Sequence, residues 1–488
     1  MKIGIPIALQ QDLLTSRTLV PFQVSGESAA IQAGANEVMR TTVESQQGRL
    51  HIQATIVDAA TQKNLSVNSA DAASAADLIT ALNTLAKRID GRAVEFSTRN
   101  PKALEALAQA AAAANAQTRV QFLSRAAIID PACGFAYLVL LDILGPTGQQ
   151  NVAPVLKEAQ ERRKQFTPYI QAKFDFTAAR LQHAPPAELT KAAQAVLAMA
   201  PNDSDVLAAL GAIRFQAGDA SGGGKYLRQA SLVNPVSPNL RNQLAMGLFQ
   251  AKRFSEAEKI LTQLDKAPAV LPELATCLLL EGDVTRANAA AERFFASVSN
   301  EQLRQLIRAT WLAATGDRAK AIDSIENTKF TDSEIKAVAL GEATIWRLLD
   351  KDYAGAKKSA AEVAADNRSG SFANLTRLLA ASNQEAGAWK READGSPALS
   401  PQAKEPLLAY GLFLGGHYAE AAQEWRKITD RQRGQDPRAN TMLAASLRKA
   451  GQGSEAGKIA VQPFVIEFGD LYGVVSFGEM RRQLAPIK

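Results

Sequence analysis

The spacing of apolar residues divides this chain into a short N-terminal part and a long helical part. Apolar and polar residues alternate through residues 38–45 and again through residues 50–58, with the polar residues 46–49 between them. Alternation with a period of two places apolar side chains on one face of a strand, so the pattern predicts a β-hairpin, with a third strand starting near Ser66. The apolar side of the second strand consists of Leu50, Ile52, Ala54 and Ile56.

Two predicted helices flank the hairpin and complete a small α/β domain. They cover residues 27–35 and residues 74–89, and the second carries an apolar stripe with helical spacing. We assign residues 1–98 to this domain. The stripe contains Leu78, Ile79, Leu82, Leu85 and Ile89.

After residue 98 the apolar residues recur with helical spacing, and the sequence repeats itself. Ala200-Pro201 is followed 34 residues later by Asn234-Pro235, with Leu210-Gly211 and Ala217-Gly218-Asp219 between them. A helix, a short turn, a second helix with a small residue at the crossing point and a terminating proline make up a tetratricopeptide-type unit. Stacking such pairs buries one continuous core, because a single pair cannot bury its own apolar face.

The same turn recurs along the chain and sets the register of the repeats. It recurs after 34 residues from Gly282 to Gly316, after 35 from Gly316 to Lys351, and after 65 from Lys351 to Gly416. The longer interval leaves room for one degenerate unit around residues 373–389. The pattern predicts roughly seven to nine helix pairs.

The helical part is predicted to contain three segments. Residues 99–200 form atypical helical repeats, with two long helices after Gln150 that are separated near His183. Residues 201–460 form the tetratricopeptide-like repeats, and residues 461–488 form a C-terminal capping segment. The expected fold class is mostly α, a tetratricopeptide-like α-solenoid with a right-handed superhelix, preceded by the small N-terminal α/β domain.

Charge and composition argue against a nucleic-acid partner. The chain has 488 residues, in which 55 lysines and arginines stand against 49 aspartates and glutamates, for a net charge of +6 and a pI near 9.1. The two signs are interspersed, whereas a nucleic-acid footprint gathers basic residues on one face. The longest apolar run, residues 132–144, is too short to span a bilayer, and residues 1–9 lack the pattern of a signal peptide. We therefore expect a soluble chain.

The residues that could carry chemistry are few and scattered. Residues 218–227 contain a glycine run followed by a lysine, but a phosphate-binding P-loop needs a glycine where Asp219 stands and a serine or threonine where Tyr226 stands. The 3 histidines lie far apart, and Cys133 and Cys277 lie in separate apolar segments where buried structural thiols are expected. We therefore expect no catalytic residue, no cofactor and no metal site, and a protein that is not an enzyme.

The N-terminal hairpin resembles a known domain. Residues 33–65 resemble the hairpin of the TolB-like amino-terminal domain that precedes tetratricopeptide arrays in many bacterial regulatory proteins, with Asp58-Ala-Ala-Thr-Gln62 at the family's turn. Leu19-Val-Pro-Phe22 resembles the family's preceding strand, and residues 162–203 resemble its long helices and first repeat. In that family the unit forms the C-terminal part of Ser/Thr kinase or cyclase-type regulators. The resemblance implies the sensory or docking part of a bacterial regulatory system, in the cytoplasm or the periplasm.

The first helices of the repeats are expected to line a concave surface that binds a partner. Asn239 and Asn242 with Met246 would combine amide hydrogen bonds with adaptable apolar contact, which suits an extended peptide or a partner helix. An alternative places Phe215 and Phe249 in the core between repeats. The candidate partner-binding residues are Asp205, Phe215, Asn239, Asn242, Met246 and Phe249.

The expected function is therefore non-catalytic recognition of a protein or peptide partner. Trp311, Trp346 and Trp425 occur about once per repeat, so they are expected in the core rather than on the binding surface. The alternative function is a module that binds a small molecule or an envelope polymer, at the junction of the α/β domain and the first repeats.

Overall fold

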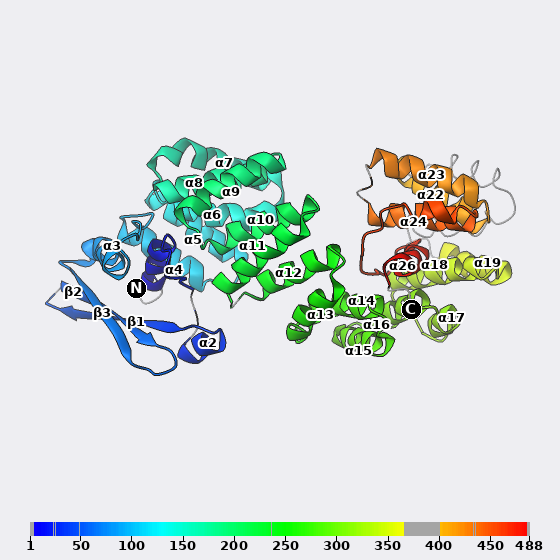
Figure 1. Cartoon of the computed structure of the whole chain (residues 1–488), viewed down its shortest axis with the longest axis horizontal. Helices are drawn as coiled ribbons and strands as arrows, with labels where there is room; N and C mark the ends of the chain where they lie inside the picture. Colours follow the sequence, from blue (N-terminus) through cyan, green and yellow to red (C-terminus); the bar gives the residue numbers. More distant parts are fainter. Residues whose placement is uncertain are drawn as a thin grey trace. The chain divides into compact units, whose positions relative to one another are not determined.

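The computed structural model describes residues 4–485, apart from Gln23, Ser25, Gly48, Val236, residues 366–400, Arg433 and Gln435. The chain forms two compact units, Met1–Gly247 and Leu248–Lys488, which we call unit 1 and unit 2 (Figure 1). Their boundary lies inside a helix, α12 (Pro238–Gln250). It therefore coincides with none of the domain limits assigned from the sequence.

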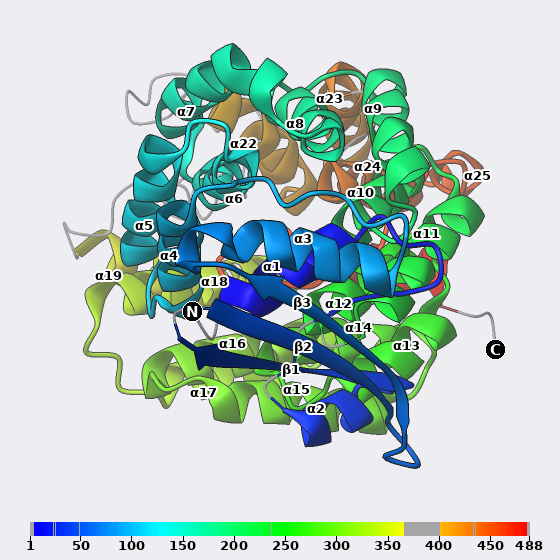
Figure 2. The ribbon, with the colours of Figure 1, turned by 90° about the vertical axis from the view of Figure 1, so that its left-hand side faces the viewer.

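The predicted hairpin and its third strand form an antiparallel sheet in unit 1 (Figure 2). Thr41 lies opposite Ala54, and Ile52 lies opposite Ala70. Leu50, Ile52 and Ala54 are buried as predicted, because a helix packs on this face of the sheet, while Ile56 is half-buried. The strands are β1 (Glu37–Gln46), β2 (Arg49–Asp58) and β3 (Asn64–Ala72), and the covering helix is α3 (Leu78–Ile89).

The segment before the sheet differs from the prediction. A helix, α1 (Gly4–Leu13), packs against α3, where the sequence predicted no element. Residues 19–22 form no strand, because the Ser16 hydroxyl accepts the backbone N–H groups of Thr18 and Leu19 and Pro21 has no N–H to donate to a sheet. The predicted helix at residues 27–35 is shorter, α2 (Glu27–Gln32).

The rest of unit 1 consists of consecutive helix pairs. The two long helices expected after Gln150 are three helices, because Pro168 starts an additional one and Thr167 before it is extended, with ψ of 153°. The helices are α4 (Pro101–Ala112), α5 (Ala116–Ile129), α6 (Gly134–Leu144), α7 (Gln149–Arg162), α8 (Pro168–Leu181), α9 (Pro186–Met199), α10 (Ser204–Gln216) and α11 (Ala220–Val233).

Unit 2 continues the helix pairs. The described residues contain ten pairs, from α4/α5 to α24/α25, rather than seven to nine. The degenerate unit predicted around residues 373–389 lies outside the described residues. The helices are α13 (Phe254–Gln263), α14 (Leu271–Leu280), α15 (Val284–Ser297), α16 (Glu301–Thr315), α17 (Arg318–Glu326), α18 (Ser333–Leu349), α19 (Tyr353–Ala365), α22 (Pro401–Leu414), α23 (Tyr418–Arg431), α24 (Pro437–Lys449), α25 (Gly453–Ala456) and α26 (Gly473–Leu484).

One turn geometry joins the two helices of most pairs, and it confirms the register predicted from the sequence. The turn contains one residue in the left-handed conformation. The backbone N–H of the residue after it donates to the carbonyl five residues earlier, as Asp317 does to Leu312, and this hydrogen bond closes the first helix. In three pairs an aspartate follows the turn glycine and caps the second helix, so Asp219 accepts the N–H of Gly222. The glycine-lysine stretch is thus a helix turn and cap. The left-handed turn residues are Gly218, Lys252, Gly282, Gly316, Lys351, Gly416 and Gly451.

The core of the repeats contains the expected residues. Trp311, Trp346 and Trp425 are buried, and so are the free thiols of Cys133 and Cys277. Within the described residues, no helix combines the length and the apolar character needed to cross a membrane. The fold is therefore mostly α, a tetratricopeptide-like series of helix pairs with a small N-terminal α/β part.

Candidate interaction surface

The C-terminal segment, residues 457–485, lies against the first helices of the pairs in unit 2. Residues 459–472 contain no helix or strand, and residues 473–484 form α26, which packs on α16 and α24. The amide nitrogen of Asn440 donates to the carbonyl of Ala460 at 3.3 Å, and that of Gln250 donates to the carbonyl of Pro463 at 3.2 Å. First-helix side chains therefore contact the backbone of an extended segment.

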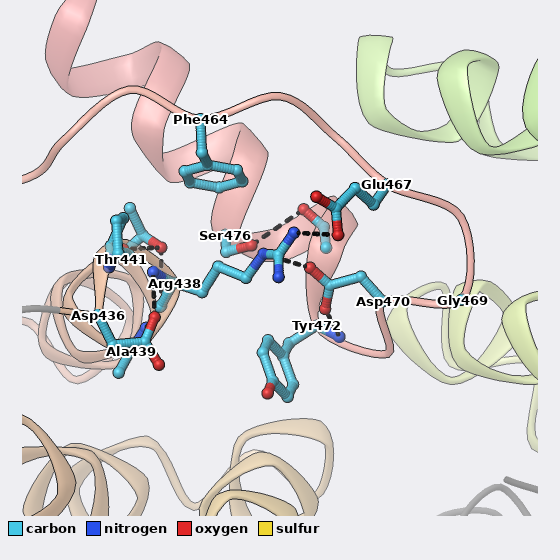
Figure 3. A network of polar contacts seen from close by, with 12 residues as sticks. Asp436, Arg438, Ala439, Thr441, Phe464, Glu467, Gly469, Asp470, Tyr472 and Ser476 are labelled. Carbon is cyan, nitrogen blue, oxygen red and sulfur yellow. Dashed lines mark hydrogen bonds and ion pairs between the residues drawn. The ribbon is translucent and has the colours of Figure 1, made fainter. Parts of the chain in front are cut away.

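Arg438, in the first turn of α24, joins the segment through two ion pairs (Figure 3). Its Nη2 lies 2.8 Å from Glu467 Oε2, and its Nε lies 2.9 Å from Asp470 Oδ2. The guanidinium carbon also lies 5.8 Å from the centre of the Phe464 ring. Burial raises the pKa of Asp470 to about 6, while the positive charge of Arg438 opposes the increase. One arginine thus binds two carboxylates and one aromatic ring of the segment.

Tyr472 inserts an aromatic ring beside two buried aromatic side chains. Its ring meets Tyr410 of α22 at a centroid distance of 5.8 Å and Trp425 of α23 at 5.6 Å, edge-on in both cases. Edge-on pairs of this kind are favourable contacts. The hydroxyl of Tyr410 and the indole N–H of Trp425 are nevertheless buried without a hydrogen-bond partner among the described residues.

Glu342 of α18 is a buried acid that contacts the same segment. It is 3% exposed, and it accepts hydrogen bonds from the Thr310 hydroxyl at 2.6 Å and from the Gly469 N–H at 2.5 Å. Burial raises the pKa of Glu342 to about 8, and these two hydrogen bonds only partly oppose the increase. The carboxyl group is therefore mostly protonated at neutral pH.

The two parts of the C-terminal segment are buried to different extents. In α26, Phe477 and Met480 are fully buried, and Glu479 pairs with Arg448 of α24 at 2.7 Å. Taken as whole residues, 464–472 are half-buried or exposed, and the Phe468 side chain is 46% exposed, although the Asp470 side chain is only 7% exposed. The segment thus consists of an anchored helix and a more accessible extended part, and it does more than cap the last pair.

Four of the six predicted partner-binding residues are accessible in unit 1. Asp205 and Asn239 are exposed, and Asn242 and Met246 are half-buried. Asp205 lies 3.4 Å from the amino group of Lys173. The side-chain oxygen of Asn242 has no hydrogen-bond partner among the described residues.

The other two predicted residues, Phe215 and Phe249, lie in the packing of the helices, which corrects their assignment to a binding surface. Phe249 is fully buried, and its ring meets Phe254 edge-on at 5.8 Å. The half-buried Phe215 ring packs against Gly223 and Gly247. It fits there because neither glycine has a side chain. The core alternative therefore holds for both, because small residues on the neighbouring helices admit large rings.

Two of the three histidines lie beside a carboxylate in the described part of the chain. His51 Nδ1 lies 2.7 Å from Asp71 on the exposed side of the sheet, and His417 lies 3.5 Å from Glu420. No group of three or more potential metal ligands occurs among the described residues. A small cavity of about 240 Å³ lies between the N-terminal part and α8/α9. It is lined by Thr15, Arg17, Arg92, Val94, Pro168, Tyr169, Ala198 and Met199.

The residues that hold the C-terminal segment could not be predicted from the sequence. Arg438, Glu342 and Tyr410 belong to first helices, but nothing in their local spacing indicates a contact with residues far along the chain. One signal was present: Glu342 is an acid inside an otherwise apolar helical stretch, where only a buried partner explains it.

No protein-family model and no curated protein matches the chain. Among solved structures, a tetratricopeptide repeat protein from Parabacteroides merdae ATCC 43184 is 15% identical, with a TM-score of 0.32 over 48% of this chain and 96% of that one. The structure of Naa15/Naa10 bound to HypK-THB is 16% identical, with a TM-score of 0.26 over 70% and 64%. A human IFIT1 dimer with m7Gppp-AAAA is 13% identical, with a TM-score of 0.29 over 66% and 87%. These weak likenesses carry no argument about function.

Proposed function

We propose that the chain is a non-catalytic scaffold that binds a protein or peptide partner through the first helices of its repeats. One observation supports this function most directly: the first helices of unit 2 already hold an extended segment. They do so by hydrogen bonds to its backbone and by an arginine that pairs with two of its carboxylates. Backbone contacts supply affinity and side-chain contacts supply specificity when an extended peptide is bound.

The partner surface that we propose lies on α10 and the first part of α12, in unit 1. Its residues are the accessible members of the predicted set, Asp205, Asn239, Asn242 and Met246. The exposed Asn239 amide can pair with a peptide backbone, and Met246 adapts to different apolar side chains.

The setting that we propose for this scaffold is a bacterial regulatory system, in which it forms the sensory or docking part. The basis is the resemblance of residues 33–65 to a TolB-like domain. An antiparallel hairpin with a third strand and a covering helix is compatible with that resemblance.

Site-specific photo-crosslinking tests the proposed surface. A benzophenone amino acid at Met246 should crosslink to one discrete protein in the native cells, and Asn239→Ala with Asn242→Ala should reduce the yield by about fivefold or more, since each lost hydrogen bond is worth about 1 kcal/mol. The control places the probe at Leu232, which is 80% exposed on the second helix α11. The same products from both positions, or none from Met246, would contradict the proposal.

A second candidate function is binding of a small anionic molecule at the junction cavity. Two arginines, Arg17 and Arg92, are among the residues that line this cavity, and the Thr15 hydroxyl donates to the Arg92 carbonyl at 2.9 Å. Its volume of about 240 Å³ is below the roughly 300–1,000 Å³ of most ligand sites, which favours the scaffold. Anionic metabolites at saturating concentration should raise the melting temperature, and Arg92→Ala should abolish the increase, if this function is correct.

A further inference from the structure

We infer that residues 463–472 are a built-in ligand of the first helices of unit 2, and that a partner segment of the same chemistry binds in their place. The partner segment is extended and carries an acidic residue, a second acidic residue three positions later and an aromatic residue two positions after that. This pattern copies Glu467, Asp470 and Tyr472. The inference rests on the scaffold function proposed above and names the kind of partner that unit 2 accepts.

The difference in burial along the C-terminal segment limits the exchange to its extended part. Phe477 and Met480 anchor α26 in the core, so this helix stays in place. The extended part is held by separate polar contacts and by the rings of Phe464 and Tyr472, and Phe468 between them is 46% exposed. Residues 463–472 can therefore leave without removing a core helix.

The charge of the contacted surface selects acidic partners. Among the described residues, Arg438 makes the ion pairs with the extended part, and its two carboxylate partners both belong to the segment. Burial lowers the pKa of Arg438, but the nearby carboxylates raise it more, so it stays charged. Asp436 lies close by, but it caps α24 by accepting the N–H groups of Arg438 and Ala439. Once residues 463–472 leave, the guanidinium is free to pair with the carboxylates of a partner.

The aromatic contact indicates that the built-in segment is an imperfect occupant. Tyr472 packs against Tyr410 and Trp425 but leaves the hydroxyl of one and the indole N–H of the other without a hydrogen-bond partner among the described residues. Buried polar atoms without partners disfavour the bound state. A partner whose aromatic residue carries or adjoins a hydrogen-bond acceptor would satisfy them, and it would bind better than the chain's own segment.

Tethering determines how the exchange must be tested. A segment attached by a short linker competes at an effective concentration in the millimolar range. A free peptide of equal affinity at micromolar concentration therefore binds the unmodified chain poorly. Weakening the built-in segment should expose the surface to a free peptide.

The probe is a fluorescein-labelled synthetic peptide with the sequence of residues 463–472, PFVIEFGDLY, added to the full chain. We expect the variant Glu467→Gln/Asp470→Asn/Tyr472→Ala to bind it at least about tenfold more tightly than the unmodified chain in fluorescence anisotropy, and Asp470→Asn alone to give a smaller gain. Adding Arg438→Ala should abolish the gain. The matched control is Arg426→Ala, because Arg426 pairs with Glu455 and has no contact with residues 463–472 in the described structure.

Chymotrypsin cleavage after Phe468 reports independently whether the extended part has been released. The inference is supported if the triple variant is cleaved faster than the unmodified chain and also binds the peptide in a way that depends on Arg438. Faster cleavage without peptide binding overturns it, and so does unchanged cleavage without binding, because the segment would then be a fixed part of the fold. These outcomes leave the scaffold proposal intact, since crosslinking at Met246 tests a surface in the other unit.

Discussion

In each unit, buried polar side chains link two neighbouring first helices, and we call this contact the polar tie. The polar ties of the two units differ in charge. In unit 1, Lys173 of α8 lies 2.9 Å from Asp203, the residue that caps α10, and the Tyr169 hydroxyl donates to the same carboxylate at 2.8 Å. In unit 2, the Thr310 hydroxyl of α16 donates to Glu342 of α18, which has no basic partner among the described residues.

The difference shows that the same fold can bury either a charged ion pair or a protonated carboxyl group. Burial lowers the pKa of Lys173, but Asp203, Tyr169 and Asp205 raise it more, so it lies well above its ordinary value. Lys173 therefore stays charged and its removal leaves a carboxylate without its cation. Glu342 is instead protonated across the neutral range, since burial raises its pKa to about 8. The first tie depends on an opposite charge, and the second depends on pH.

The largest effect is expected when the cation is removed from the tie in unit 1. Lys173→Met should reduce the free energy of unfolding by about 3–5 kcal/mol, because Asp203 keeps its burial but loses its ion pair. Arg180→Met is the matched control, since its pair with Asp142 is half exposed, and it should cost about 0–1 kcal/mol. Equal losses in urea denaturation would mean that burial does not distinguish the two pairs.

The labelling rates of the two buried cysteines report which unit a substitution destabilises. Cys133 lies in unit 1 and Cys277 in unit 2, both are buried, and burial raises the pKa of the Cys133 thiol to about 11. Each thiol therefore reacts with a labelling reagent only when its surroundings open. Lys173→Met should accelerate labelling of Cys133 and leave Cys277 unchanged.

The stability of unit 2 is expected to depend on pH. The folded-state pKa of Glu342 is about 8 against an ordinary 4.5, so the folded state retains a proton that the unfolded chain loses between these values. Stability should therefore fall as pH rises, by about 2–3 kcal/mol between pH 5 and pH 7 at about 1.4 kcal/mol per pH unit. Glu342→Gln should remove this part of the dependence.

Thermal unfolding of the wild type and Glu342→Gln at several pH values measures the effect. Burial also raises the pKa of Asp12 in unit 1 to about 8 and that of Asp470 to about 6, so these acids add to the pH dependence of both proteins. The quantity to compare is therefore the difference in stability between the wild type and Glu342→Gln at each pH. That difference should change with pH, and labelling of Cys277 should follow it. A constant difference from pH 5 to pH 8 would show that Glu342 is ionised in the folded protein.

The parts of this structure that sequence could predict are those fixed by local spacing. The turn positions from Gly218 to Gly451 follow from a repeat of about 34 residues, because each turn needs a left-handed residue and each second helix needs a cap. The hairpin follows from alternation in the same way. Helix α8 was missed because its start at Pro168 resembles an interruption of one long helix.

The candidate site could not be predicted because its contacts join distant segments. Gly469 lies 127 residues from Glu342, and the role of Arg438 depends on where residues 463–472 pass. Local patterns identify core and turn positions, whereas the path of a segment without helix or strand depends on the whole unit. The burial of Phe249 was an alternative that the pattern could state but not decide.

The smallest effect is expected at the helix crossings, where the units again solve one problem in two ways. In α10/α11 the large Phe215 on the first helix faces Gly223 on the second. In the corresponding positions of α14/α15 stand Leu279 and Ala287, both buried. The pair α12/α13 combines buried Phe249 with buried Ala257 at these positions, so the close approach of the ring to Gly223 is a property of α10/α11.

Single substitutions at neighbouring glycines should separate this crossing from helix propensity. A Cβ at Gly223 would lie 2.6 Å from the Phe215 ring and 2.9 Å from the Gly211 carbonyl oxygen, so Gly223→Ala should cost about 1–3 kcal/mol. At Gly224 the nearest atoms belong to the flexible end of Arg228, 3.4 Å away, so Gly224→Ala should stabilise by about 0.5–1 kcal/mol. Adding Phe215→Leu to Gly223→Ala reproduces the pair found in α14/α15 and should recover part of the loss. Urea denaturation of the four proteins decides the point, because equal losses with and without Phe215→Leu would place the conflict at the backbone of Gly211 instead of the ring.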